Sequence, residues 1–178
     1  MTIFIIVGMP ASGKNCAKDY AKAKGYPYFA TGDIVRMEVA KRAIEANAEN
    51  MGSVSTEMRG ADGLGVTRQA LSTALNQNSP VVFLEGMRSW PEIKLIKESA
   101  DACVIAFLAP RKLRLERIMS RGRSDDSAEA FDARDMREIE YGTAVPVALA
   151  DAYILNTSSM DDAVNTLDEI VKKSLMRG

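Results

Sequence analysis

Five short apolar runs are spaced along the chain, at Thr2–Val7, Tyr26–Phe29, Val81–Leu84, Ala102–Leu108 and Ala152–Leu155. They are rich in Ile, Val, Phe and Leu, and most show little polar alternation, as strands buried on both faces do. Longer segments between them carry apolar residues at helical spacing. This alternation predicts an α/β fold built on a doubly wound, five-stranded parallel sheet with helices on both faces.

A polar or glycine-rich segment follows every apolar run. In chain order these segments read GMPASGKN, ATGDIVR, EGMRSW, APRKLRLERIMSR and NTSS. The carboxyl ends of parallel strands meet at one edge of an open sheet, and such sheets bind ligands there. We therefore expect one binding edge, with Lys14 and Arg88 on the same side of the molecule.

Two stretches interrupt the core pattern. The first, residues 37–70, contains the glycine-rich part Asn47–Thr67, and the second, residues 122–140, begins with the polar part Gly122–Ala130. We expect both to project from the binding edge, the first as a substrate-binding excursion and the second as a lid. A chain of 178 residues fits one domain, so 1–178 is expected to form a single unit.

Composition narrows the classes of function. With 23 basic and 24 acidic residues the net charge is −1, so no overall field favours nucleic acid or an anionic membrane. The chain has no histidine, and Cys16 and Cys103 form no CxxC pattern, which argues against zinc sites and histidine catalysis. No apolar stretch approaches the ~20 residues of a membrane span, and the N-terminal run is too short for a signal peptide. We expect a reduced, cytoplasmic protein with small-molecule partners.

The segment after the first run has the G-x-x-x-x-G-K spacing of a phosphate-binding loop. Glycines at both ends let successive backbone N–H groups turn inward, and the following helix start and lysine add positive charge. The alternative is a chance glycine turn with a solvated lysine. The predicted ATP-binding loop comprises Gly8, Met9, Pro10, Ala11, Ser12, Gly13, Lys14, Asn15 and Cys16.

Asn15 departs from the usual loop, which has Ser or Thr at this position as a ligand of Mg²⁺. An amide oxygen is also a neutral ligand, although a helix cap is an equally good interpretation. Asp33 and Glu85 both follow predicted strands and are suited to hold the waters that Mg²⁺ usually retains. The predicted metal set is therefore Asn15, Asp33 and Glu85, acting mainly through water.

A second anion site is predicted from the segments after the second and third runs. A hydroxyl and an arginine at a helix start suit a phosphate or a nucleoside, and a second arginine adds a bidentate fork. A simple helix cap with a surface arginine is the alternative. The predicted acceptor-binding residues are Thr31, Gly32, Asp33, Arg36, Gly86 and Arg88.

Arginines recur at three- and four-residue spacing after the fourth run, which places Arg111, Arg114, Arg117 and Arg121 on one stripe of a helix. The apolar residues Leu115, Ile118 and Met119 are expected on the opposite side. Such a stripe is often only solvated, but it starts at the binding edge, so we expect Arg117 and Arg121 to contact phosphate or adenine. With Lys14 and Arg88 they form the predicted catalytic set, and Arg123, Arg134 and Arg137 are lid candidates.

Together, GMPASGKN, FATGDIVR, VVFLEGMRS and LERIMSR resemble in order and spacing the adenylate and related nucleoside-monophosphate kinases of the P-loop superfamily. The short excursion with RSDDS also resembles an archaeal family related to dephospho-coenzyme A kinase. The resemblance implies a P-loop NTPase-type fold with ATP as donor and Mg²⁺ as cofactor. It assigns Gly8–Asn15 to the ATP phosphates, Thr31, Arg36 and Arg88 to the acceptor, and Arg117 and Arg121 to the donor and the moving phosphoryl group.

This sequence differs from the family pattern at three positions. Asn15 replaces the loop hydroxyl, Glu85 stands where adenylate kinases carry Asp, and Arg88 follows Gly86 by two residues instead of three. The leading hypothesis is a kinase acting on a nucleoside monophosphate. The 3′-hydroxyl of dephospho-coenzyme A is the alternative acceptor, and a nucleotide-binding regulator with little transfer activity is the alternative from another class.

Overall fold

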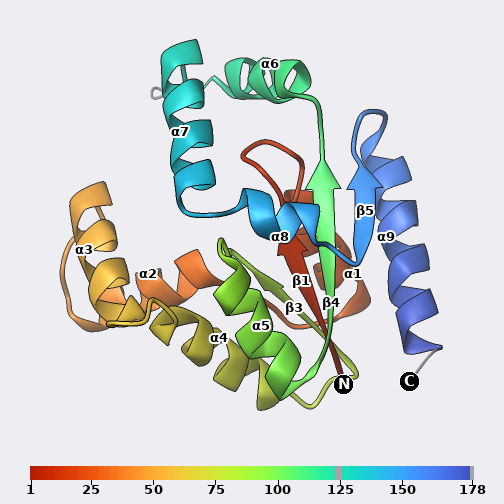
Figure 1. Ribbon diagram of the computed structural model, residues 1–178, viewed down its shortest axis with the longest axis horizontal. Helices are drawn as coiled ribbons and strands as arrows, with labels where there is room; N and C mark the ends of the chain where they lie inside the picture. The colour runs from red at the N-terminus through yellow and green to blue at the C-terminus, as the bar shows by residue number, and fades with distance from the viewer. Residues whose placement is uncertain (123–125, 177–178) are drawn as a thin grey trace.

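A computed structural model describes residues 1–122 and 126–176 of the chain (Figure 1). Its sheet has five strands in the order β2-β3-β1-β4-β5, and all four pairings are parallel. The strands are β1 (Thr2–Val7), β2 (Tyr28–Ala30), β3 (Val81–Glu85), β4 (Asp101–Leu108) and β5 (Ala152–Leu155). The predicted α/β fold is confirmed, and β2 is the strand whose start differs most from the prediction.

Helices connect the strands, and several begin at a residue whose side chain caps the helix. Ser89 and Ser159 each form a capping box, and Asn47 and Ser127 each accept a hydrogen bond from a backbone N–H of the first turn. The helices of the described residues are α1 (Asn15–Lys24), α2 (Thr31–Lys41), α3 (Ala48–Arg59), α4 (Gly65–Leu75), α5 (Trp90–Ser99), α6 (Arg111–Arg121), α7 (Ala128–Glu140), α8 (Ala144–Ala148) and α9 (Met160–Leu175).

The sheet is buried on both faces, as the unbroken apolar character of β1 predicts. On one face, Ile3, Ile5 and Val7 pack with residues of α2, α4 and α5. On the other face, Phe4 and Ile6 pack with α1 and α9. Alternate residues of one strand therefore belong to two different cores.

Both predicted excursions consist largely of helices and the turns between them where the structure describes them. Residues 37–70 contain the end of α2, all of α3 and the start of α4, and α7 occupies most of residues 122–140. Arg123, a predicted lid residue, lies outside the described residues. In the parts of the chain that the structure describes, no helix has the length and apolar character needed to cross a membrane.

The prediction that Leu115, Ile118 and Met119 form the apolar side of α6 is wrong for Met119. Ile118 is buried, but Met119 is 53% exposed, whereas Arg114 is only 6% exposed. The reason is the position of α6, which lies beyond the carboxyl end of β4 instead of against a face of the sheet (Figure 1). It packs on the phosphate-binding loop and α7, and these neighbours present polar partners to its arginines.

A buried ion pair joins α6 to α7. The guanidinium of Arg114 donates to the two carboxylate oxygens of Asp135 at 2.7 and 2.6 Å, and to the carbonyl oxygen of Pro10 at 3.0 Å. The two side chains are 7% and 9% exposed. The guanidinium carbon also lies 5.2 Å from the ring centre of Phe131. This pair therefore holds α6, α7 and the phosphate-binding loop together.

Replacing Asp135 by Ala should lower the free energy of unfolding by about 3 kcal/mol, because it leaves the buried Arg114 guanidinium without its counter-ion. Urea denaturation measures this loss. Asp132→Ala is the matched control on the same helix, because Asp132 pairs with Arg111 on the surface and should change the midpoint little. Equal destabilisation by the two variants would contradict the structural role of the buried pair.

Candidate functional site

The turn from β1 to α1 has a backbone that requires glycine at both ends. Gly8 and Gly13 have φ angles of 149° and 95°, which side chains rarely adopt. A Cβ on Gly13 would lie 1.8 Å from Nδ2 of Asn156, and one on Gly8 would lie 2.6 Å from the carbonyl oxygen of Phe107. The loop therefore lies against neighbouring segments so closely that neither position has room for a side chain.

The ammonium of Lys14 is turned into this loop. Its Nζ donates to the carbonyl oxygens of Gly8 and Met9 at 2.7 and 3.2 Å. Burial lowers the pKa of Lys14 below its usual value, and the nearby carboxylates of Glu85 and Glu138 act in the opposite direction. A bound phosphate would supply a closer negative charge and favour the protonated lysine.

Asn156 fixes the loop from the end of β5, although the sequence analysis did not name it as a site residue. It is 2% exposed. The side-chain Nδ2 of Asn156 donates to the backbone carbonyl oxygen of Ser12 at 3.0 Å. The backbone carbonyl oxygen of Asn156 accepts from Arg117 at 2.9 Å. Arg117 also donates to the carbonyl oxygen of Ala11 at 3.2 Å. The polar segment NTSS after the fifth run was the available signal for this contact.

A cavity of about 290 Å³, here called the donor cavity, adjoins the start of α1 and α6. Every residue that lines it except Ile118 is a predicted site residue, and its charged members are Lys14, Glu85, Arg117 and Arg121. Cys16 does not line it, because its side chain is buried in the core, where burial raises the pKa of the thiol to about 11. The complete lining of the donor cavity is Ala11, Gly13, Lys14, Asn15, Glu85, Arg117, Ile118 and Arg121.

Two of the three predicted metal residues, Asn15 and Glu85, line the donor cavity. One oxygen of Glu85 accepts from the hydroxyl of Tyr28 at 2.8 Å. Asp33 is instead paired with Arg36 and lines none of the cavities described here. Within residues 1–122 and 126–176, no group of three acidic, Cys or His residues is placed to hold a metal. One carboxylate and one amide fit Mg²⁺, which takes its remaining ligands from water and phosphate.

A smaller cavity of about 140 Å³, the inner cavity, lies beside the loop. Its charged lining residues are Lys14, Glu85, Arg88 and Glu138. The predicted residues Gly8, Pro10 and Gly86 also border it. Gly86 has a φ of 100°, and a Cβ there would lie 2.1 Å from the Thr31 hydroxyl oxygen, so the segments after β2 and β3 touch at this point.

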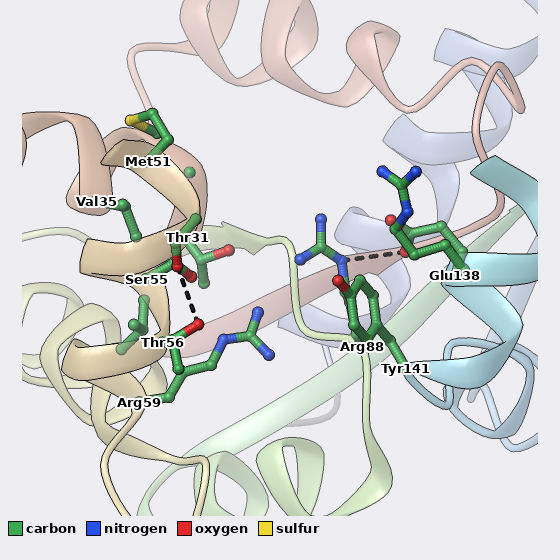
Figure 2. A pocket seen from close by; sticks show the side chains of 13 residues that line it. Thr31, Val35, Met51, Ser55, Thr56, Arg59, Arg88, Glu138 and Tyr141 are labelled. Carbon is green, nitrogen blue, oxygen red and sulfur yellow. Dashed lines mark hydrogen bonds and ion pairs between the residues drawn. The ribbon is translucent and has the colours of Figure 1, made fainter. Parts of the chain in front are cut away.

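A cavity of about 400 Å³, here called the outer cavity, is formed by α2, α3, the segment after β3 and the end of α7 (Figure 2). The predicted residues Thr31, Gly32, Arg88 and Arg137 line it, whereas Arg36 does not. Several of the other lining residues fall within Asn47–Thr67, and the expected position of this segment at the binding edge was the available signal for them. The lining residues that the sequence analysis did not name as site residues are Val35, Met51, Gly52, Ser55, Thr56, Arg59, Val66, Glu138 and Tyr141.

Arg88 lies where the inner and outer cavities adjoin, and it lines both. Its Nε donates to a carboxylate oxygen of Glu138 at 3.1 Å, and the Thr143 hydroxyl donates to the same oxygen at 3.0 Å. Its guanidinium carbon lies 5.3 Å from the ring centre of Tyr141. These contacts use the Nε edge of the guanidinium and orient the side chain at the cavity wall (Figure 2).

Arg121 of the predicted catalytic set and Arg134, a predicted lid residue, bond to the same buried carboxylate. Asp126, whose side chain is 1% exposed, accepts from Arg121 at 2.6 Å and from Arg134 at 3.3 Å. Arg121 thus belongs both to the donor cavity and to the link between α6 and the start of α7. The roles of these arginines toward a ligand remain predictions.

Solved structures share this fold. The crystal structure of TT1252 from Thermus thermophilus matches with a TM-score of 0.67 at 18% identity over 97% of both chains. A gluconokinase from Sinorhizobium meliloti matches with a TM-score of 0.60 at 13% identity, over 99% of this chain and 97% of that one. Shikimate kinase from Aquifex aeolicus matches with a TM-score of 0.57 at 12% identity over both whole chains. The fold is therefore that of P-loop kinases, as the resemblance implied.

Sequence comparison agrees over nearly the whole chain. Residues 7–132 match the AAA domain family. A UPF0200 protein of Methanocaldococcus jannaschii is 34% identical over 180 residues, which cover 98% of this chain and 91% of that protein. A UPF0200 protein of Thermococcus gammatolerans is 33% identical over 187 residues, which cover 99% and 98%. The chain thus belongs to the UPF0200 family, and its phosphate-binding loop is part of an AAA domain with a P-loop kinase fold.

Proposed function

We propose that this protein is an ATP-dependent kinase that transfers the γ-phosphoryl group of Mg·ATP to a nucleoside monophosphate. The observation that carries the proposal is the position of Arg88, which lines the inner cavity together with Lys14 and the outer cavity together with Thr31. An anion held by Arg88 in the outer cavity would face the phosphate-binding loop. Two ligands can then meet at one guanidinium, as a transfer reaction requires.

On the donor side, the backbone amides of the loop, the start of α1 and Lys14 would hold the ATP phosphates. Arg117 and Arg121 line the donor cavity beside them. Asn15 and Glu85 would hold Mg²⁺ largely through water, and the ion would neutralise charge on the β- and γ-phosphates.

On the acceptor side, the predicted acceptor-binding residues Thr31, Gly32 and Arg88 line the outer cavity, and Gly86 borders the inner cavity next to Thr31. Arg137 adds a further guanidinium from α7. The cavity volume of about 400 Å³ is in the range of sites for small molecules. The attacking atom would be a phosphate oxygen, which needs no proton removed, so catalysis would consist of positioning and charge stabilisation by Lys14 and the arginines.

One observation favours a second candidate, transfer to a hydroxyl group such as the 3′-hydroxyl of dephospho-coenzyme A. Glu138 places a carboxylate in the inner cavity together with Lys14 and Arg88. A phosphate acceptor has no use for a base there, whereas a hydroxyl acceptor must lose a proton, and a carboxylate within reach is suited to take it.

A phosphoryl-transfer panel tests the proposal, with Mg·ATP as donor and AMP, CMP, UMP, GMP or dephospho-coenzyme A as acceptor. We expect turnover with a monophosphate, and Lys14→Ala should reduce it by roughly 100-fold or more, because a charge that stabilises the transition state is lost. Lys22→Ala, at an exposed position near the end of the same helix, is the control and should retain activity.

The outcomes of this panel separate the candidates. Turnover only with dephospho-coenzyme A would favour the hydroxyl acceptor, and binding of one nucleotide without any transfer would favour a regulator. Unchanged turnover in Lys14→Ala would refute the assignment of the loop as the donor site.

Replacing Arg88 by Ala should raise the KM for the acceptor by roughly 10-fold or more and leave the KM for ATP nearly unchanged, because a charge-assisted hydrogen bond to the acceptor is lost. Steady-state kinetics with each substrate varied in turn measures this split. Arg88→Lys keeps the charge without the bidentate fork and should lie between the wild type and Ala. An equal rise in both KM values would argue against an acceptor role.

Asn15→Thr restores the usual residue of the loop. We expect no gain in Mg²⁺-dependent turnover, because the amide of Asn15 faces the same cavity as Glu85 and supplies a neutral oxygen itself. Turnover measured across a Mg²⁺ titration provides the comparison. A large increase in turnover at low Mg²⁺ would instead mark this loop as impaired in holding the metal.

A further inference from the structure

Arg59 is an arginine of the outer cavity that the sequence motifs did not indicate. It is the last residue of α3, it is partly buried, and it lines the cavity together with Ser55 and Thr56 from the same helix. Figure 2 shows its guanidinium extending from the α3 side into the space that Arg88 borders from the other side. The two side chains thus face the same volume from elements that are far apart in the sequence.

Arg59 differs from the neighbouring arginines in its partners. Arg42 is paired with Glu38 and Glu57, and Arg68 is paired with Asp62. In the described part of the chain, no carboxylate lies within ion-pair distance of Arg59. Its guanidinium group contacts the ring of Tyr141, whose centre lies 6.0 Å from the guanidinium carbon.

The same ring also contacts Arg88, at 5.3 Å. Two guanidinium groups thus converge on one ring at the edge of one cavity, and Arg137 adds a third to its lining. Glu138 is the one carboxylate among the described lining residues of the outer cavity, and it is already bonded to Arg88. This excess of positive charge matches a phosphate dianion, which would relieve the repulsion between the arginines.

The position of Arg36 supports this interpretation. The sequence analysis expected Arg36 to bind the acceptor, but its side chain is 58% exposed and paired with Asp33, and it does not line the outer cavity. Where α2 and α3 border the outer cavity, the guanidinium group that lines it belongs to Arg59 of α3 and not to Arg36 of α2.

We propose that Arg59 is an acceptor-binding residue, which together with Arg88 holds the anionic group of the acceptor between α3 and the segment after β3. The identity of that acceptor rests on the proposed function, but the anion site itself does not require transfer to occur. Because Arg59 belongs to the 37–70 excursion and Tyr141 follows α7, an anion bound here would also link these two parts of the molecule.

Calorimetric titration tests this assignment directly. The donor site is first filled with Mg²⁺ and a non-hydrolysable ATP analogue, and then AMP, adenosine and inorganic phosphate are titrated in separate experiments. We expect Arg59→Gln to weaken AMP and phosphate roughly 10- to 100-fold, because one charge-assisted contact is lost, and to leave adenosine affinity unchanged. Arg59→Lys should recover part of the loss.

Two arginine variants serve as controls. Arg68→Gln removes an arginine of the same excursion that is paired on the surface, and it should bind all three probes like the wild type. Arg36→Gln should weaken AMP less than Arg59→Gln does. Wild-type affinity for AMP and phosphate in Arg59→Gln, or a larger loss in Arg36→Gln, would overturn the proposal, as would the absence of AMP and phosphate binding to the wild type.

This experiment separates the two proposals. If the wild type binds AMP through Arg59 but transfers no phosphoryl group, the kinase function fails and the anion site stands. If transfer proceeds and Arg59→Gln retains the KM and affinity for AMP, the assignment of Arg59 fails and the kinase function stands.

Discussion

The structure depends most on the way the loop after β1 surrounds the Lys14 ammonium. A buried cation needs nearby oxygen atoms, and here the carbonyl groups of Gly8 and Met9 supply them. The curled backbone is possible because Gly8 and Gly13 adopt positive φ angles in places without room for a side chain. The loop is then fixed from outside by the Asn156 amide, which bonds to the Ser12 carbonyl oxygen. The shape of the loop is thus fixed by contacts within the protein itself.

The second organising feature is the set of contacts that α6 and α7 make with this loop. Arg114 bonds to Asp135 and to the Pro10 carbonyl oxygen, so one guanidinium connects both helices with the loop. At the other end of α7, Glu138 bonds to Arg88 where the inner and outer cavities adjoin. One helix is therefore linked to the loop at its middle, through Arg114, and to Arg88 at its end. Any movement of α7 would therefore change the contacts of the loop and the contacts of Arg88 together, as alignment of the two proposed ligands would require.

Much of the fold could be predicted because the apolar runs are continuous. A strand such as β1, buried on both faces, has no polar alternation, so its position and its place inside a parallel sheet follow from composition alone. The prediction failed on α6, where Arg114 is buried and Met119 is exposed. Helical periodicity identifies the two sides of a helix but not what each side packs against. Because α6 meets a loop and another helix instead of the sheet, its buried side is partly charged.

The candidate site divides in the same way. The glycine-rich loop after β1 and the position of Thr31 and Arg88 near it could be predicted from the sequence, because all of them follow strands whose carboxyl ends share one edge of the sheet. Only packing between distant segments places Asn156 against the loop and brings Arg59, Glu138 and Tyr141 to the outer cavity. Arg59 and Glu138 belong to α3 and α7, and Tyr141 and Asn156 directly follow α7 and β5. The relative placement of these elements depends on packing between segments that are far apart in the sequence. The spacing of residues along one helix carries no information about that placement. The glycine positions of the loop and the apolar runs of the strands are local features, so they can be read from neighbouring residues.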